Sequence, residues 1–253
     1  MKAVRILVKA ANALLSAAAV LFLITAGSYS AYALWDNAQV YSTADNVMSE
    51  LLSLKPQSGA QEDNGASFEE LLAVNGDVCA WLTLDGTRID YPILQGEDNL
   101  SYINTDVYGR FALAGSIFLD SRCDNTFHDA YALVYGHHMD NGRMFGDLDK
   151  YKDGKFFGEN SAGALILPDR SYKLEIFACM LVPAAEGMIF DTQMRQTDIG
   201  GLLDFAEAEA VHLRPDTVET ARGAESPQII ALSTCSSEYT DARTIVLAYM
   251  TPY

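Results

Sequence analysis

The stretch QIIALSTC, residues 228–235, is an apolar run of strand length that ends in a cysteine. After a short polar loop, Arg243 opens a second run of the same kind, TIVLAYM at residues 244–250. A third run, AYALVY at residues 130–135, leads within two residues to His137. Apolar runs of this length, rich in β-branched and aromatic residues, are typical of strands. Three predicted strand ends therefore carry a thiol, a guanidinium and an imidazole.

These three groups are the parts of a nucleophilic cysteine enzyme. A free thiol is mostly protonated at neutral pH, so a neighbouring base or positive charge is needed to form the thiolate. Histidine can transfer protons, and arginine can stabilise an oxyanion without losing its own charge. Taken alone, Cys235 would be interpreted as a buried structural cysteine. The polar residues on both sides of it favour a partly exposed strand end instead.

The folded part of the chain is predicted to be mainly β. Strands are expected at residues 78–84, 88–94, 115–119, 130–135, 164–167, 172–182, 228–234 and 244–250. Asp85-Gly86 joins the first two as a hairpin turn. Many short strands without regular helices between them favour a closed antiparallel β-barrel of about eight strands over a parallel α/β sheet.

Helices are predicted before the barrel and between its strands. A short helix is expected over residues 44–54, and a capping-box sequence at residues 67–70 starts another. Residues 144–157 predict a helical segment, and residues 198–212 carry an apolar stripe at helical spacing. The last of these is a helical insertion before the strand that ends at Cys235.

The N-terminal segment predicts a membrane anchor. Residues 1–9 are basic, and residues 10–34 contain no charged side chain. A helix of this length can cross a hydrocarbon core of roughly 30 Å. The basic flank favours a cytoplasmic N-terminus and an extracellular remainder. A cleaved signal peptide is the alternative, because residues 31–33 fit a cleavage site, but the apolar run is longer than is usual for such peptides.

The chain is accordingly divided into four segments. Residues 1–9 are assigned to the cytoplasm, and residues 10–34 form a single-pass anchor in the cell membrane. Residues 35–66 comprise an extracellular helix and a polar linker broken by Pro and Gly. The catalytic domain is expected to occupy residues 67–253.

Composition argues against several classes of protein. With 17 Lys and Arg against 34 Asp and Glu, the chain lacks the basic face that binds nucleic acid. Acidic clusters at residues 61–63 and 207–209 lack the alternating spacing of a calcium loop. We therefore predict neither a metal nor another cofactor.

The four cysteines lie far apart and form no CxxC pair, which argues against zinc. Two disulfides are one possibility for an extracellular chain. Cys79 and Cys179, however, lie within apolar runs, where a buried thiol acts as a small apolar group. Cys123 lies in a polar loop, which favours an exposed thiol, and no role is assigned to it.

Five segments together resemble the signature regions of class B sortases, the membrane-anchored cysteine transpeptidases of Gram-positive bacteria. The segments are IDYPI at 89–93, GSIFLD at 115–120, YGHHM at 135–139 with Met144-Phe145 after it, DLDKY at 147–151, and LSTC at 232–235 with Arg243 after it. They occur in the family's order, and the resemblance extends from Phe68 to Ala248. The interval from Cys235 to Arg243 is shorter than in the best-known class B enzymes, which leaves the subclass open.

The resemblance implies a sortase-like barrel and a role for each matching residue. Cys235 matches the nucleophile, His137 the catalytic histidine, and Arg243 the arginine of the following strand. Asn99 and Ser233 match positions that line the sorting-signal groove. His138, next to His137 on an extended segment, is expected to point to the other side of the chain.

The implied reaction is transpeptidation. Cys235 attacks a C-terminal sorting signal of a secreted surface protein and forms a thioester, which an amine then resolves. The amine belongs to peptidoglycan or its precursor, or to a pilin lysine. Two alternatives stay open: a cell-wall cysteine peptidase that only hydrolyses, and a non-catalytic binding module on the same barrel. In papain-like peptidases the cysteine opens a helix and precedes its histidine, whereas here the order is reversed.

Overall fold

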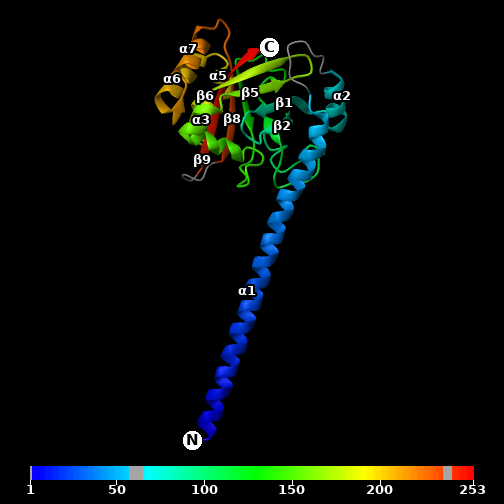
Figure 1. The fold of residues 1–253 in the computed structure, drawn as a ribbon, viewed down its shortest axis with the longest axis vertical. Helices are drawn as coiled ribbons and strands as arrows, with labels where there is room; N and C mark the ends of the chain where they lie inside the picture. Colours follow the sequence, from blue (N-terminus) through cyan, green and yellow to red (C-terminus); the bar gives the residue numbers. More distant parts are fainter. Residues whose placement is uncertain (1, 57–64, 236–240) are drawn as a thin grey trace. The chain divides into compact units, whose positions relative to one another are not determined.

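The computed structural model describes residues 2–56, 65–235 and 241–253 (Figure 1). At residues 65–67 and at Cys235 it describes the backbone alone. The chain separates into two compact units, Met1–Thr43 and Ala44–Tyr253. Most of the predicted linker, residues 57–64, lies outside the described residues.

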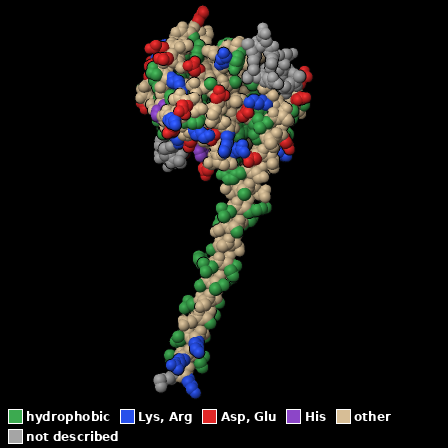
Figure 2. All heavy atoms as spheres, in the orientation of Figure 1, with side chains coloured by type: hydrophobic (Ala, Val, Ile, Leu, Met, Phe, Trp, Pro, Cys, Tyr) green, Lys and Arg blue, Asp and Glu red, His purple; other side chains and the backbone are tan. Residues whose placement is uncertain are grey.

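The first unit is the greater part of one long helix, α1 (Lys2–Leu51). Figure 2 shows basic side chains at the start of this helix and apolar side chains along it. Among the residues that the structure describes, it is the one helix long and apolar enough to cross a membrane. A signal sequence would have the same length and composition, so the helix is compatible with a single-pass anchor without fixing the topology.

The second unit begins with the last turns of α1. Met48 and Leu51 are buried in this unit. The carboxylate of Glu50 accepts a hydrogen bond of 2.8 Å from the Tyr108 hydroxyl, and Asp45 forms an ion pair of 2.6 Å with Arg143. The compact unit therefore includes residues 44–54, which the sequence assigns to the segment before the catalytic domain.

The strands agree closely with those predicted. They are β1 (Val78–Leu84), β2 (Asp90–Leu94), β3 (Ile117–Leu119), β4 (Tyr131–Tyr135), β5 (Ala162–Ile166), β6 (Ser171–Pro183), β7 (His212–Leu213), β8 (Gln228–Cys235) and β9 (Ala242–Pro252). The helices after α1 are η1 (Leu52–Leu54), α2 (Gly65–Val74), η2 (Gly146–Lys152), α3 (Gly154–Glu159), α4 (Gly187–Phe190), α5 (Thr192–Arg195), α6 (Ile199–Glu209) and α7 (Pro215–Gly223). Helices α4, α5 and α7 and strand β7 were not predicted.

Eight of these strands close into a barrel in the order β5-β1-β2-β3-β4-β8-β9-β6, because β5 also pairs with β6. The first half of β6 pairs with β5, and Ala178 and Cys179 in its second half pair with β7. Helices α6 and α7 contact each other and β6, and Figure 1 shows them grouped at one side of the barrel. The predicted barrel of about eight strands is confirmed.

The barrel is mixed rather than wholly antiparallel. β2 pairs with β3, and β4 with β8, in the parallel sense. A short hairpin loop forces antiparallel pairing, whereas a long connection lets the next strand start at the same end. Residues 95–116 provide such a connection between β2 and β3, and β5 to β7 intervene between β4 and β8.

Three of the four cysteines are buried thiols: Cys79, Cys123 and Cys179. Burial raises the pKa of both Cys79 and Cys123 to about 12. The prediction of buried thiols is confirmed for Cys79 and Cys179, and the expectation that Cys123 is exposed is wrong. The loop after β3 turns back on itself, because the amide of Cys123 donates to the carbonyl of Asp120 at 2.9 Å. The Gln95 amide covers the same turn by donating to the carbonyls of Cys123 and Asp120.

Candidate active site

Strand β8 lies between β4 and β9, and this arrangement brings the three predicted catalytic positions to one end of the sheet. Ser233 pairs with Tyr135 on the parallel side, and Cys235 pairs with Arg243 on the antiparallel side. Beyond Tyr135, the amide of Gly136 donates to the carbonyl of Ser233 at 3.1 Å, so the chain continues alongside β8. His137 therefore follows β4 where Cys235 ends β8.

The register also determines which face of the sheet these positions share. Residues paired directly across an antiparallel ladder lie on the same face, with Cβ atoms about 5 Å apart. Positions 235 and 243 are such a pair. Alternation along the strand puts position 233 on the same face as 235. The side chain of Cys235 and residues 236–240 lie outside the described residues, so the assignment of positions 233, 235 and 243 to one face rests on the backbone.

The imidazole of His137 is half-buried and has a fixed partner. Its Nε2 lies 2.7 Å from the carbonyl oxygen of Ile103. A carbonyl oxygen can only accept, so Nε2 carries a proton in this arrangement. Nδ1 is then the nitrogen through which the ring can exchange a proton with a neighbouring group.

Glycine is required before His137 because the backbone there is closely packed. A Cβ on Gly136 would lie 2.5 Å from Cδ1 of Ile117 and 2.7 Å from the ring of Phe145. Cβ atoms in proteins essentially never approach so closely. The absence of a side chain at Gly136 therefore lets this segment pass between Ile117 and Phe145 on its way to His137.

The guanidinium of Arg243 is half-buried at the start of β9. Its Nη1 donates to the carbonyl of Ala242 at 3.0 Å. Within the described parts of the chain, no carboxylate forms an ion pair with it. An isolated surface arginine is more often an ion-pair partner. The backbone pairing of Arg243 with Cys235 places Arg243 beside the end of β8.

The two predicted groove residues differ in their surroundings. Ser233 is almost completely buried. The Asn99 side chain is partly exposed, and its amide is already bonded within the protein: Nδ2 donates to Asp120 at 2.9 Å, and Oδ1 accepts from the amide of Ser121 at 2.7 Å. In this arrangement Asn99 fixes the loop beside His137.

The buried carboxylate of Asp120 connects this loop to β4. It accepts hydrogen bonds from Asn99, from Nε and Nη2 of Arg122, and from the hydroxyl of Tyr135 at 3.0 Å. Burial opposes the charged form, but these hydrogen bonds outweigh it and lower the pKa of Asp120. Burial, together with the charge of Asp120, raises the pKa of Tyr135 above its usual value.

The insertion between β6 and β8 packs against β4. The ring of Phe190, at the end of α4, stacks on Tyr135 with centroids 6.4 Å apart. Arg122 also donates to the carbonyl of Phe190 at 2.9 Å. The side-chain amide of Gln196 makes two hydrogen bonds with the backbone of Tyr131. The parts of the insertion that make these contacts with β4 are α4, α5 and the residue after α5, all of which precede the predicted helix α6.

Sequence reasoning missed the supporting residues around the three candidates. The carbonyl of Ile103 has no sequence signal, because any residue could supply it. Asp120 lies in one of the segments that carry the resemblance, as does Asp149, but nothing in the pattern indicates their partners. Contacts of this kind depend on tertiary structure.

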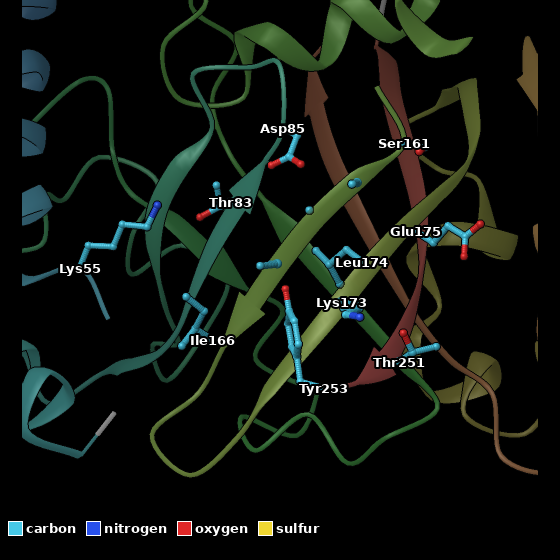
Figure 3. Close-up of a pocket in the computed structure, with 13 residues that line it drawn as sticks. Lys55, Thr83, Asp85, Ser161, Ile166, Lys173, Leu174, Glu175, Thr251 and Tyr253 are labelled. Atoms are coloured by element: carbon cyan, nitrogen blue, oxygen red, sulfur yellow. The ribbon is translucent and has the colours of Figure 1, made fainter. Parts of the chain in front are cut away.

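A cavity of about 630 Å³ lies elsewhere on the barrel, over β1, β5 and β6 (Figure 3). Lys173 and Thr251 line it, and these two residues pair at the end of the β6–β9 ladder opposite to Arg243. Figure 3 shows acidic, basic and aromatic side chains around it, including Asp85 and Tyr253. The cavity is therefore separate from the candidate active site.

Known proteins share this chain's sequence and barrel. It is 34% identical over 172 residues to sortase B of Listeria monocytogenes, and the match covers 68% of each chain. A Streptococcus pyogenes class B sortase involved in pilus biogenesis superposes with a TM-score of 0.65 at 38% identity, over 74% of this chain and 99% of that one. A mutant form of Clostridium perfringens sortase B superposes with a TM-score of 0.71 at 28% identity, over 80% of this chain and 96% of that one.

No family model matches the chain, so the family assignment rests on these relatives. The identity to the Listeria protein extends over two thirds of the chain, and the same barrel is present in the solved relatives. The chain therefore belongs to the class B sortases, a family of cysteine transpeptidases.

Proposed function

We propose that the chain cleaves the C-terminal sorting signal of secreted proteins and transfers them to an amine outside the cell, with Cys235, His137 and Arg243 as its catalytic residues. The observation that carries the proposal is the pairing of Cys235 with Arg243, beside the strand that leads to His137. We further propose that the N-terminal helix is retained as a single-pass anchor with the barrel outside the cell. The acidic surface and the long apolar helix fit that setting.

In the first half-reaction the thiol of Cys235 gives its proton to Nδ1 of His137, and the resulting thiolate attacks the carbonyl carbon of the scissile peptide bond. The electron pair moves to the carbonyl oxygen, and the guanidinium of Arg243 stabilises the resulting negative charge. When the tetrahedral intermediate collapses, the C–N bond breaks and Nδ1 of His137 gives a proton to the leaving amine. A thioester between Cys235 and the new C-terminal residue of the cleaved protein remains.

In the second half-reaction an amine attacks the thioester carbonyl. His137 accepts a proton from this amine, the C–S bond breaks, and an amide forms with release of the thiolate. Peptidoglycan or its precursor can supply the amine. A pilin lysine is the alternative source of the amine, because the Streptococcus pyogenes relative is involved in pilus biogenesis. Asn99 and Ser233 are proposed to line the groove for the sorting signal.

Transfer is distinguished from hydrolysis by adding an acceptor. The full-length chain in detergent is incubated with a library of sorting-signal peptides, with and without triglycine. We expect the acyl product to shift from the free acid to the triglycine amide, detected by mass spectrometry. Free acid alone in both reactions would support the hydrolytic peptidase. If no peptide is cleaved or ligated, the result would favour the hypothesis of a non-catalytic binding module.

Gly136→Ala should slow this reaction without preventing folding. The added methyl group displaces the segment that leads to His137, and misplacement of a catalytic group by about 1 Å can cost about a hundredfold in rate. We expect kcat to fall by at least about tenfold in the peptide assay. Gly158→Ala is the matched control, because its Cβ would meet no atom within 4 Å. Equal rates for the two variants would contradict this role for Gly136.

A further inference from the structure

A polar cluster lies beside the candidate site, centred on the carboxylate of Asp149 in η2. The Thr244 hydroxyl donates to Oδ1 of Asp149 at 2.8 Å. Lys152 lies 3.0 Å from the same oxygen, and Nε2 of His138 lies 3.1 Å from Oδ2. We call these four residues, Asp149, Thr244, Lys152 and His138, the Asp149 cluster.

Two members of the Asp149 cluster are direct chain neighbours of candidate catalytic residues. Thr244 follows Arg243, and His138 follows His137. Adjacent residues on a strand point to opposite faces, so Thr244 lies on the face away from Arg243. His138 bonds Asp149, whereas His137 bonds Ile103, so these adjacent imidazoles also have different partners. The carboxylate of Asp149 thus connects the start of β9 with the segment that follows β4.

Asp149 is itself held firmly. Leu148 and Tyr151, on either side of it in η2, are fully buried. Oδ2 of Asp147 accepts from the amide of Arg88 at 2.8 Å, which ties η2 to the turn between β1 and β2. Thr244 is fully buried as well. Asp149, His138 and Lys152 are partly exposed, but hydrogen bonds to a charged acceptor are the stronger class, so the Asp149 cluster can fix the distance between two segments.

We propose that Asp149 is a positioning residue, which sets the start of β9 and the segment after β4 at a fixed separation through Thr244 and His138. Arg243 and His137, which each precede a member of the Asp149 cluster by one residue, are thereby aligned. The inference rests on the proposed function for its effect on rate, but the coupling between the two segments can be measured without it.

The test is a pair of substitutions at Thr244, the buried member of the cluster. Thr244→Val keeps the shape and removes the hydroxyl, whereas Thr244→Ser keeps the hydroxyl. In the full-length chain we expect Thr244→Val to lower kcat for the peptide by at least about tenfold, with KM changed less than about twofold. Thr244→Ser should restore kcat to near the wild-type value. Asp149→Asn should lower kcat as Thr244→Val does.

Hydrogen exchange measured by mass spectrometry is the second readout. We expect Thr244→Val to speed exchange in peptides covering residues 137–145 and 242–247 together, and Thr244→Ser to leave both protected. Asp124→Asn is the matched control, because it alters another carboxylate near a histidine, His128, which precedes β4 at the end away from His137. It should change neither readout.

The two readouts separate the two hypotheses. If wild-type protein turns over no peptide, the proposed function fails, and joint exchange at the two segments still supports the coupling through Asp149. If wild-type protein is active but Thr244→Val keeps its kcat, the positioning role is overturned while the function stands. The positioning role would also be overturned if both Thr244 variants exchanged faster throughout the barrel and both lost thermal stability, because the effect would then be general destabilisation.

Discussion

Cys235→Ala is expected to abolish turnover, with a loss of at least about a thousandfold in kcat. Without the sulfur atom no thioester can form, and the Arg243 guanidinium then has no tetrahedral intermediate to stabilise. The check is the peptide assay combined with intact-protein mass spectrometry. Wild-type protein stopped during turnover should carry the acyl group, and the variant should carry none. A variant that still accumulated the acylated form would exclude Cys235 as the nucleophile.

Alkylation of the folded protein tests the same residue without any substrate. The pKa of Cys79 and Cys123 is raised by burial to about 12, so these two thiols hold almost no thiolate at neutral pH. Cys179 is also buried. Iodoacetamide should therefore add one label to wild-type protein and none to Cys235→Ala. Cys123→Ala is the matched control and should keep both the label and the turnover.

His137→Gln is expected to lower kcat by about a hundredfold to ten-thousandfold, the usual contribution of a general acid–base group. The amide nitrogen of glutamine can still donate to the carbonyl of Ile103, which accepts from Nε2 of the imidazole at 2.7 Å. The local fold is therefore preserved, while the group that carries a proton to the leaving amine is lost. Steady-state kinetics and a thermal melt of each protein separate these effects.

The control for this substitution is His128→Gln. His128 is exposed and lies near Asp124, before β4 starts. Its loss should leave kcat unchanged. If His137→Gln retained more than a tenth of the wild-type kcat at an unchanged melting temperature, His137 would not be the acid–base residue.

Most of the fold could be predicted from local pattern. Apolar runs such as residues 172–182 and 228–234 became β6 and β8, since short runs bounded by turn residues have few other stable conformations. The parallel pairing of β4 with β8 could not be predicted, because it depends on which strands meet after β5 to β7 have folded. Helices α4 and α5 are each a single turn, too short for periodicity to identify.

The three principal residues of the candidate site could be predicted from the sequence, but the residues that hold them in place could not. Cys235, His137 and Arg243 each end or begin a recognisable run, and their roles remain predictions. The exposure expected for Cys123 was wrong, because polar neighbours in sequence do not reveal that a loop turns inward. The partners of Asp120 and Asp149 come from distant parts of the chain, so no local pattern indicates them.

The central place of β8 between β4 and β9 has a consequence for how the protein matures. Strands β8 and β9 follow the other strands along the chain, and each also pairs with a strand far back in the sequence, β8 with β4 and β9 with β6. Contacts of such long range form late and slowly. A nascent chain therefore cannot pair positions 235 and 243 until β9 has been synthesised. Under the proposed function, the chain would therefore begin to cleave peptides only after the whole barrel has closed.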